Sequence, residues 1–412
     1  MKIAIIGGGA SGMILASKLY NKNVTIFERN SKLGKKLILT GNGKCNFTND
    51  DFENIDEIYN NNLAKEIYKK FDKDDFLCYM KELGIVPKKE NHRGKVYYYP
   101  NNNKSSSVYY SLLDKIKNNN INILCNSYVN DIVVNDGKFN IVTDTNTYIF
   151  DKVIIATGGM SYKNTGSDGS FYSIIKKLGH NIIKPLPALC GFFHNDKILK
   201  STKGFRVDAT VKFEVNNNST TKKYVESGEI QFTENKISGI PIMNLSRYIS
   251  REIDNGHKVT LHLDFYNIDN NTSLKDEELT LYNELKNRRE NIFYKDAKDF
   301  LCGFLPDELS TAIINKASIC KPKVENITDA ELKSIVSLIS DYTINDISLS
   351  GFENAQITIG GVDVNDINTV NLESKIVKNL YFIGEVIDID GPCGGYNLQL
   401  AYSSASVVAN FI

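Results

Sequence analysis

"KIAIIGGGASGMILASKLYNKNVTIFER", residues 2–29, decides the fold of this chain. Residues 2–6 form a short β-rich apolar run, as in a buried parallel strand. A glycine turn follows, then a stretch with helical spacing, then a second apolar run that ends at Glu28. The order strand, turn, helix, strand within about 30 residues predicts a Rossmann-like unit in an α/β protein.

The glycine turn contains G-x-G-x-x-G as Gly7, Gly9 and Gly12. Gly7 permits the tight turn, Gly9 lets the backbone approach a pyrophosphate, and Gly12 lets the helix pack close to the strand. The N-terminus of the following helix offers free N–H groups and partial positive charge to phosphates. A strand before the turn and a helix after it favour a dinucleotide site over a plain glycine turn.

Glu28 lies 21 residues beyond Gly7, at the end of the second strand. This is the place of an acid that binds a ribose hydroxyl, and its charge would repel a 2′-phosphate. The ligand is therefore FAD or NAD rather than NADP. No second G-x-G-x-x-G follows a strand, so a nicotinamide would bind only transiently, or the electrons come from the substrate.

The bulk composition narrows the class of protein. A chain of 412 residues is long enough for two or three domains. Lys plus Arg equals Asp plus Glu at 49 each, which argues against a general nucleic-acid binder. We find no run of 18 apolar residues and no signal-peptide pattern, so we expect a cytoplasmic protein without a membrane span. Seven scattered cysteines and five histidines without H-x-x-x-H predict neither a disulfide framework nor a metal site.

The rest of the chain changes pattern several times. Residues 51–120 are mostly helical by pattern, with polar loops such as "NHRGKVYYYP", residues 91–100. A β-meander follows and ends in "KVIIATGG". Short alternating stretches up to about residue 265 predict a small β domain, and residues 272–338 predict two or three helices. The chain closes as strand, glycine loop and helix.

Several blocks resemble one family of flavoproteins. They are "LILTGNGKCNFTN", "VIIATGGMSYKNTGSDGSFYSIIKKLGH", "QFTENKISGIPIMNLS", "ITIGGVDV" and "ESKIVKNLYFIGEVIDIDGPCGGYNLQLA". Together they are similar to the BaiN-like or aminoacetone-oxidase family of FAD flavoproteins (YhiN type), within the two-dinucleotide-binding-domain superfamily. The resemblance spans almost the whole chain and implies FAD as the cofactor.

The resemblance also implies how the domains are arranged. The Rossmann-like FAD-binding domain would be split in sequence, with an inserted β-barrel-like domain and a small helical domain. We place the FAD-binding domain at residues 1–188 and 356–412. The inserted β domain would comprise residues 189–270 and 338–355, and the helical domain residues 271–337.

The same resemblance implies the residues of the FAD site. The ADP half would be held by Gly7, Gly9, Ala10, Ser11, Gly12, Glu28 and Arg29, with the backbone of Val129 at the adenine. The pyrophosphate and flavin side would be wrapped by Lys36, Thr40, Gly41, Asn42, Gly43, Cys45 and Asn46. Two further segments would run along the cofactor, and their residues are Ala156, Thr157, Gly158, Gly384, Glu385 and Asp388. The residues that would lie against the flavin ring are Gly395, Tyr396, Asn397 and Leu398.

Two residues are candidates for catalysis. Tyr396 follows the flavin-side glycines and could donate a proton or stack. Cys45 neighbours Lys44, whose charge would favour a thiolate, yet free cysteines are commonly buried and inert. We expect neither Cys45 nor Cys393 to be essential.

The polar stretch around His92 and Arg93, with its three tyrosines, has two interpretations. It could bind an anionic or flat substrate near the flavin. It could also be a loop that packs over the FAD domain, and the sequence favours this second interpretation.

We therefore predict an FAD-dependent oxidoreductase, either a reductase or an oxidase. It would act on a small organic substrate by hydride transfer through flavin N5, with NAD(P)H as a transient reductant. The family carries bile-acid and aminoacetone labels. Both imply a small organic substrate, but they name different compounds, so the substrate stays open. The alternatives are an FAD-dependent RNA-modifying protein and a non-catalytic redox-sensing flavoprotein. Neutral charge counts against RNA, so we expect no nucleic-acid partner and no membrane partner.

Overall fold

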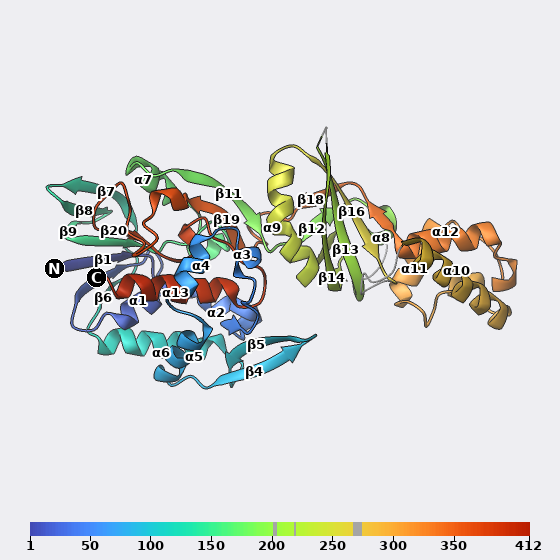
Figure 1. Cartoon of the computed structure of the whole chain (residues 1–412), viewed down its shortest axis with the longest axis horizontal. Coiled ribbons are helices and arrows are strands. Elements are labelled where there is room, and N and C mark those ends of the chain that lie inside the picture. Colours follow the sequence, from blue (N-terminus) through green and yellow to red (C-terminus); the bar gives the residue numbers. More distant parts are fainter. Residues whose placement is uncertain (201–203, 218–219, 267–273) are drawn as a thin grey trace. The chain divides into compact units, whose positions relative to one another are not determined.

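The computed structural model describes residues 1–200, 204–217, 220–266 and 274–412. The chain forms two compact units, one made of residues 1–187 and 356–412, the other of residues 188–355. Figure 1 shows the helices and strands of both units. None of the helices in the described ranges combines the length and the apolarity needed to cross a bilayer.

A five-stranded parallel sheet forms the centre of the first unit. Its order is β20 (Leu380–Phe382), β10 (Lys152–Ile155), β1 (Lys2–Ile6), β2 (Asn23–Phe27) and β6 (Asn122–Leu124). The strands are almost wholly apolar because both faces of a parallel sheet are covered. The edge strand β20 comes from the last part of the chain, so the Rossmann-like sheet is split in sequence. The predicted α/β fold is confirmed.

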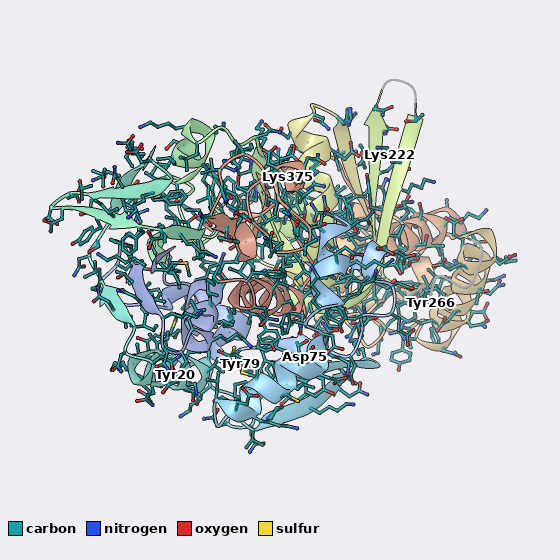
Figure 2. The ribbon with its side chains drawn as sticks, turned by 60° about the vertical axis from the view of Figure 1, so that its left-hand side comes forward. Tyr20, Asp75, Tyr79, Lys222, Tyr266 and Lys375 are labelled. Atoms are coloured by element: carbon teal, nitrogen blue, oxygen red, sulfur yellow. The ribbon has the colours of Figure 1, made fainter. Side chains whose placement is uncertain are left out.

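Helices from both ends of the chain pack together in this unit. α1 (Ala10–Lys18) contacts both α13 (Tyr396–Ala409) and α6 (Ser105–Asn118). α5 (Lys73–Glu82) carries Asp75 and Tyr79, which Figure 2 labels, and the Tyr79 ring lies 5.2 Å from that of Tyr402 on α13. The C-terminal helix is therefore fixed by aromatic packing on segments from the first quarter of the chain.

The stretch 87–100 is a β-hairpin, which corrects the expectation of a polar loop. β4 (Pro87–His92) pairs with β5 (Lys95–Pro100), which pairs with β3 (Thr48–Asn49). The connecting residues Arg93 and Gly94 have φ values of 54° and 81°. Two positive φ values give the turn whose twist suits a two-residue hairpin. The sequence does not reveal this hairpin, because arginine is not a usual residue at that turn position.

A second hairpin in the same unit follows the expected meander. β7 (Val129–Asn135), β8 (Lys138–Thr143) and β9 (Thr147–Phe150) form a three-stranded antiparallel sheet. Its first turn, Asp136–Gly137, has φ values of 48° and 72°. The remaining elements of the unit are α2 (Lys35–Leu39), α3 (Ile55–Ile58), α4 (Leu63–Tyr68), α7 (Tyr172–Lys177), β11 (Ile182–Ala188) and β19 (Ile357–Val362).

The second unit contains a curled antiparallel sheet. Its order is β17 (Tyr342–Ile344), β16 (Lys258–Asp264), β13 (Phe205–Asn217), β14 (Thr220–Phe232), β15 (Lys236–Gly239), β12 (Phe192–His194) and β18 (Ile347–Leu349). The two edge strands, β17 and β18, are joined by Asn345 and Asp346 alone. The sheet must therefore curl until its edges approach, which confirms the β-barrel-like insertion as a half-barrel.

The helices of the second unit share one core with this sheet. They are α8 (Lys197–Lys200), α9 (Ile240–Asp254), α10 (Leu274–Asn291), α11 (Asp307–Lys316) and α12 (Asp329–Ser340). Leu285 and Leu332 belong to the same buried cluster as Phe213 and Leu261 of the strands. Helix α9 was not predicted, since it lies within the segment whose pattern favours strands.

Candidate functional site

The glycine turn after β1 combines close packing with open space. A Cβ on Gly7 (φ 102°) would lie 2.5 Å from the Ala156 carbonyl oxygen, and one on Gly12 would lie 2.1 Å from the Gly7 carbonyl oxygen. A Cβ on Gly9 would meet nothing within 4 Å. No side chain caps the start of α1, so its first N–H groups face this space. The turn fits a phosphate group.

Glu28 is held in place beside this turn. Its Oε2 accepts a hydrogen bond from Gly8 N at 2.9 Å, and its Oε1 accepts from Asn30 N at 2.8 Å and Asn30 Nδ2 at 2.7 Å. Carboxylate oxygens have further lone pairs, so a ribose hydroxyl can still bind. Ser127 N donates to the Glu28 carbonyl at 2.9 Å, which brings the start of β7 at Val129 close to Glu28. Contact of Val129 with an adenine stays a prediction.

Arg29 contributes to the wall of this region. Its guanidinium group lies 2.8 Å from the Asp168 carboxylate and 4.9 Å from the centre of the Tyr128 ring. The charge of Arg29 is therefore already paired within the protein.

A polar network joins four segments that lie apart in the sequence, at the middle of the site. Lys36 Nζ lies 2.8 Å from Glu385 Oε2 and 2.7 Å from Ser161 Oγ. Thr358 N donates to Glu385 Oε1 at 2.9 Å. Lys36 and Glu385 were predicted from the sequence, whereas Ser161 and Thr358 were not. Both lie in the family-like blocks, but no spacing rule pairs them with Glu385.

The neighbouring residues complete this part of the site. A Cβ on Gly384 (φ 70°) would lie 2.6 Å from Ser11 Oγ, so the turn after β20 touches the first turn of α1. Asp388 Oδ1 accepts from Gly360 N at 3.1 Å and from Asn60 Nδ2 at 3.2 Å. A Cβ on Gly158 (φ 71°) would lie 3.7 Å from Glu385 Oε2. Ala156 N donates to Ile6 O at 2.8 Å, so the segment that continues into Thr157 runs beside the glycine turn.

The loop from Thr40 to Asn46 has an unusual backbone. Gly41, Asn42, Gly43 and Cys45 have φ values of 56°, 52°, 82° and 58°. Non-glycine residues in this region carry strain, which persists at functional sites when the surroundings enforce it. Asn46 Oδ1 is buried and finds no hydrogen-bond partner in the part of the chain that the structure describes. A buried acceptor without a partner fits a donor supplied by a ligand.

The same loop touches the glycine turn near the C-terminus. A Cβ on Gly395 (φ 93°) would lie 2.9 Å from Asn46 Oδ1 and 2.8 Å from Thr48 Cα. Asn49 Nδ2 donates to Gly394 O at 2.8 Å. The structure thus brings together the two segments that the resemblance places at the flavin.

The start of α13 resembles the start of α1 in one respect, the lack of a capping side chain, although Gly395 is closely packed where Gly9 is not. Asn397 braces the preceding loop, since its Oδ1 accepts from Gly391 N at 3.0 Å and its Nδ2 donates to Gly391 O at 2.9 Å. Leu398 is half-buried one residue further on. The backbone N–H groups at the start of α13, which no side chain caps, fit the hydrogen-bond-accepting edge of a flat ring.

The structure weighs against catalysis by Cys45. Its side chain is 0% exposed. Burial raises the pKa of the thiol to about 12, and a hydrogen bond with Thr40 offsets only part of this rise. A protonated thiol is a poor nucleophile, so burial suits Cys45 to packing beneath the loop.

Tyr396 is tied to its surroundings by both ends. It is 3% exposed, and its hydroxyl donates to Asp51 Oδ2 at 3.1 Å. Tyr59 donates to the Tyr396 carbonyl at 2.8 Å, and the Phe52 ring lies 5.2 Å from the Tyr396 ring. A role in catalysis stays a prediction, and any proton would leave through Asp51.

Known proteins resemble this chain over its full length. The family described as HI0933-like protein Rossmann domain matches residues 1–411. A 3-dehydro-bile acid delta(4,6)-reductase from Clostridium scindens is 29% identical over 98% of this chain and 97% of its own. A ribosomal RNA dihydrouridine synthase from Haemophilus influenzae is 28% identical over 98% of this chain and 96% of its own. A solved quinol-fumarate reductase with menaquinol molecules shares the fold, with 12% identity, a TM-score of 0.50, and coverage of 100% of this chain and 70% of that one.

Proposed function

This chain belongs to the HI0933-like family of Rossmann-domain proteins and is an FAD-dependent oxidoreductase, and we propose that it reduces a carbon–carbon double bond conjugated to a carbonyl group in a small organic substrate. The full-length similarity to a delta(4,6)-reductase of a 3-dehydro compound carries this proposal. A dihydrouridine synthase also saturates a carbon–carbon double bond next to a carbonyl group. Both named activities therefore reduce the same type of bond.

Residues of the first unit offer partners to the phosphates, a ribose and the flavin of FAD. The open space over Gly9 takes the phosphates, and Glu28 takes a ribose hydroxyl. Asn46 Oδ1 and the N–H groups at the start of α13 face the flavin. These N–H groups stabilise negative charge that develops on the ring during reduction. Bound FAD supplies hydride transfer through its N5.

NAD(P)H is the proposed source of electrons, and it binds only transiently. The chain has a single strand–turn–helix unit of the dinucleotide type, at residues 2–29. FAD occupies that unit in this proposal. A nicotinamide would then reach the flavin from the substrate side and leave before the substrate enters.

Reduction of uridine in RNA is the second candidate. Relatives named ribosomal RNA dihydrouridine synthase favour it. Charge argues against it, because residues 188–355 hold 21 Lys and Arg against 25 Asp and Glu. An RNA-binding insertion is expected to show a basic excess. We therefore place the small organic substrate first.

An anaerobic absorption experiment tests the proposal. The purified protein should be yellow and should bleach with NADH or NADPH. A 3-oxo-4-ene steroid added without oxygen should restore the oxidised spectrum. A colourless protein that cannot be reconstituted with FAD would contradict the cofactor. Reoxidation by uridine-containing RNA, but not by the steroid, would establish the second candidate, and reoxidation by neither would favour a redox-sensing protein.

A further inference from the structure

We infer that the hydroxyl groups of Ser167 and Tyr172 bind the ribityl chain of FAD, the neutral segment between the flavin ring and the phosphates. The inference rests on the proposed function, because it adds two binding residues to the same FAD site. Neither residue was predicted from the sequence, and neither belongs to the network around Lys36 and Glu385.

Both hydroxyl groups are buried without a hydrogen-bond partner. Ser167 and Tyr172 are each 7% exposed. Among the residues that the structure describes, neither Ser167 Oγ nor the Tyr172 hydroxyl oxygen finds a partner. Such a hydroxyl loses its hydrogen bonds to water on folding and gains none in return. A native protein keeps a group of this kind where a ligand or an ordered water bonds to it.

The position of Ser167 is set by its neighbours in the loop that precedes α7. Arg29 lies 2.8 Å from the Asp168 carboxylate, directly after Ser167. Two residues before it, the Thr165 carbonyl accepts a hydrogen bond from Asn30 Nδ2 at 2.9 Å. These contacts fix the loop against the segment that follows β2. The Ser167 hydroxyl is therefore not needed to hold the loop in place.

The Ser167 hydroxyl lies beside Glu385, at the middle of the FAD site. A Cβ on Gly158 (φ 71°) would lie 3.1 Å from Ser167 Oγ and 3.7 Å from Glu385 Oε2. Because Gly158 has no side chain, both oxygens stay within reach of a ligand that passes this glycine. The loop of Ser167 and the segment of Glu385 thus meet at the same point of the site.

Tyr172 approaches the same region from α7. This helix contacts β19, and two backbone N–H groups of β19 donate to the carboxylates of Glu385 and Asp388 (Figure 1). Burial raises the pKa of the Tyr172 phenol, and the charges of Glu385 and Asp388 raise it further. Charges act strongly only at short range, so the phenol lies near both carboxylates. It keeps its proton and can donate a hydrogen bond.

The charges around the two hydroxyls select the part of FAD that binds here. Lys36 neutralises one of the nearby carboxylates, that of Glu385. The other, Asp388, accepts from neutral backbone and amide donors, so its charge would repel a pyrophosphate. Ribityl hydroxyls are neutral, and each can both donate and accept. They can therefore donate to a carboxylate and also bond with Ser167 and Tyr172.

The test measures FAD binding to the full-length chain after its FAD has been removed. Ser167→Ala and Tyr172→Phe each delete one hydroxyl. We expect each to raise the Kd for FAD about tenfold, the loss of one hydrogen bond, measured by the change in flavin fluorescence. The Kd for ADP, measured by calorimetry, should stay unchanged, because ADP lacks the ribityl chain. The FAD-free variants should have a Tm no lower than that of the wild type, since the deleted hydroxyl had no partner.

Ser170→Ala and Tyr148→Phe are matched controls. Ser170 lies in the same loop, but its hydroxyl already donates to Asp168 Oδ1 at 2.6 Å. The Tyr148 hydroxyl accepts from Asn146 Nδ2 at 3.4 Å. Both controls should leave the Kd for FAD unchanged, and Ser170→Ala should lower the Tm of the FAD-free chain.

Three results would overturn the inference. The first is an unchanged Kd for FAD in both variants, which would assign the two hydroxyls to ordered water. The second is an equal rise in the Kd for FAD and for ADP, which would place the contact at the ADP half. The third is a lower Tm of the FAD-free Ser167→Ala and Tyr172→Phe chains, which would show that the hydroxyls have partners within the protein.

The proposed function can fail separately. If the chain binds FAD but its reduced flavin is not reoxidised by the steroid, the proposed reaction is wrong, whereas the rise in Kd still supports the two hydroxyls. A wild-type chain that binds no FAD would overturn both.

Discussion

The two ends of the candidate FAD site are built in different ways. At the end around Glu28, the glycine turn, the helix and the acid all come from one stretch of sequence. At the end around Gly395, the contacts join Asn46, Tyr97 and the C-terminal turn, which lie far apart in the chain. At the first end Gly7 and Gly12 are packed against backbone atoms, whereas at the second end Gly394 is packed against the Tyr97 side chain and Gly395 against both the Thr48 backbone and the Asn46 side chain. The first should therefore tolerate substitution less than the second.

The largest effect is expected at the first end, from Gly12→Ala. Its Cβ would lie 2.1 Å from the Gly7 carbonyl oxygen, and a backbone atom cannot move aside without displacing α1. We expect a loss of about 3 kcal/mol or more in the free energy of unfolding, measured by denaturant titration, and little bound FAD. Gly9→Ala is the control, because its Cβ meets nothing within 4 Å. It should fold normally and bind FAD more weakly, and normal FAD affinity would show that the phosphates lie elsewhere.

Gly394→Ala is the corresponding change at the second end, and its effect should be smaller. The clash is with the Tyr97 ring at 2.8 Å, and a side chain can move, although the φ of 121° remains unfavourable. We expect a loss of about 2 kcal/mol in the free energy of unfolding. The double variant Gly394→Ala with Tyr97→Leu should recover part of it. No recovery would show that the backbone angle, rather than the ring, causes the whole loss.

The two hairpin tips sharpen the comparison further. Replacing Arg93 by glycine should raise the free energy of unfolding by about 1 kcal/mol, because it relieves a left-handed non-glycine residue. Asp136→Gly should change it by a few tenths, since aspartate tolerates this conformation. Thermal unfolding of both variants measures the difference. A destabilised Arg93→Gly protein would mean that Arg93 contributes to folding through its own contacts.

The smallest effect is expected at Cys45. With a pKa of about 12 caused by burial, the thiol stays protonated at every pH at which the protein is handled, so no activity should titrate with it. Native alkylation at pH 8, followed by mass spectrometry, should label the exposed Cys78 and Cys320 before Cys45. Cys45→Ser should keep its turnover. Lost turnover with normal FAD content would restore Cys45 as a catalytic residue.

The sequence predicted the local structure of residues 2–29 correctly, as strand, turn, helix and strand. An apolar run, three spaced glycines and an acid follow one another there. Each is required by the local backbone geometry of a single unit of about 30 residues, so the sequence alone reveals it. The resemblance extended the prediction to FAD and to the split domain with its β-barrel-like insertion. It named Lys36 and Glu385, but not Ser161 or Thr358, because hydrogen-bond partners in a folded network follow no fixed spacing.

Two elements of the fold were not predicted from the sequence, each for a physical reason. The hairpin at residues 87–100 was missed because Arg93 takes a backbone conformation that arginine rarely adopts. α9 was missed because its residues lie among β-rich stretches, where the alternating pattern of the neighbours outweighed its own helical spacing. At Arg93 the surrounding fold overrode the local preference, whereas α9 follows its own helical spacing.

The sequence by itself determined the Rossmann-like unit, the identity of the cofactor and the oxidoreductase class, because each follows from short-range pattern or from family-wide blocks. Only the tertiary structure decided what the flavin side is made of. Lys36 meets Glu385 across 349 residues, Asn46 meets Gly395, and Tyr97 meets Gly394, because β20 and α13 complete the sheet and core begun by the N-terminus. Burial is likewise a property of the whole fold, and it makes Cys45 a packing residue beneath a strained loop.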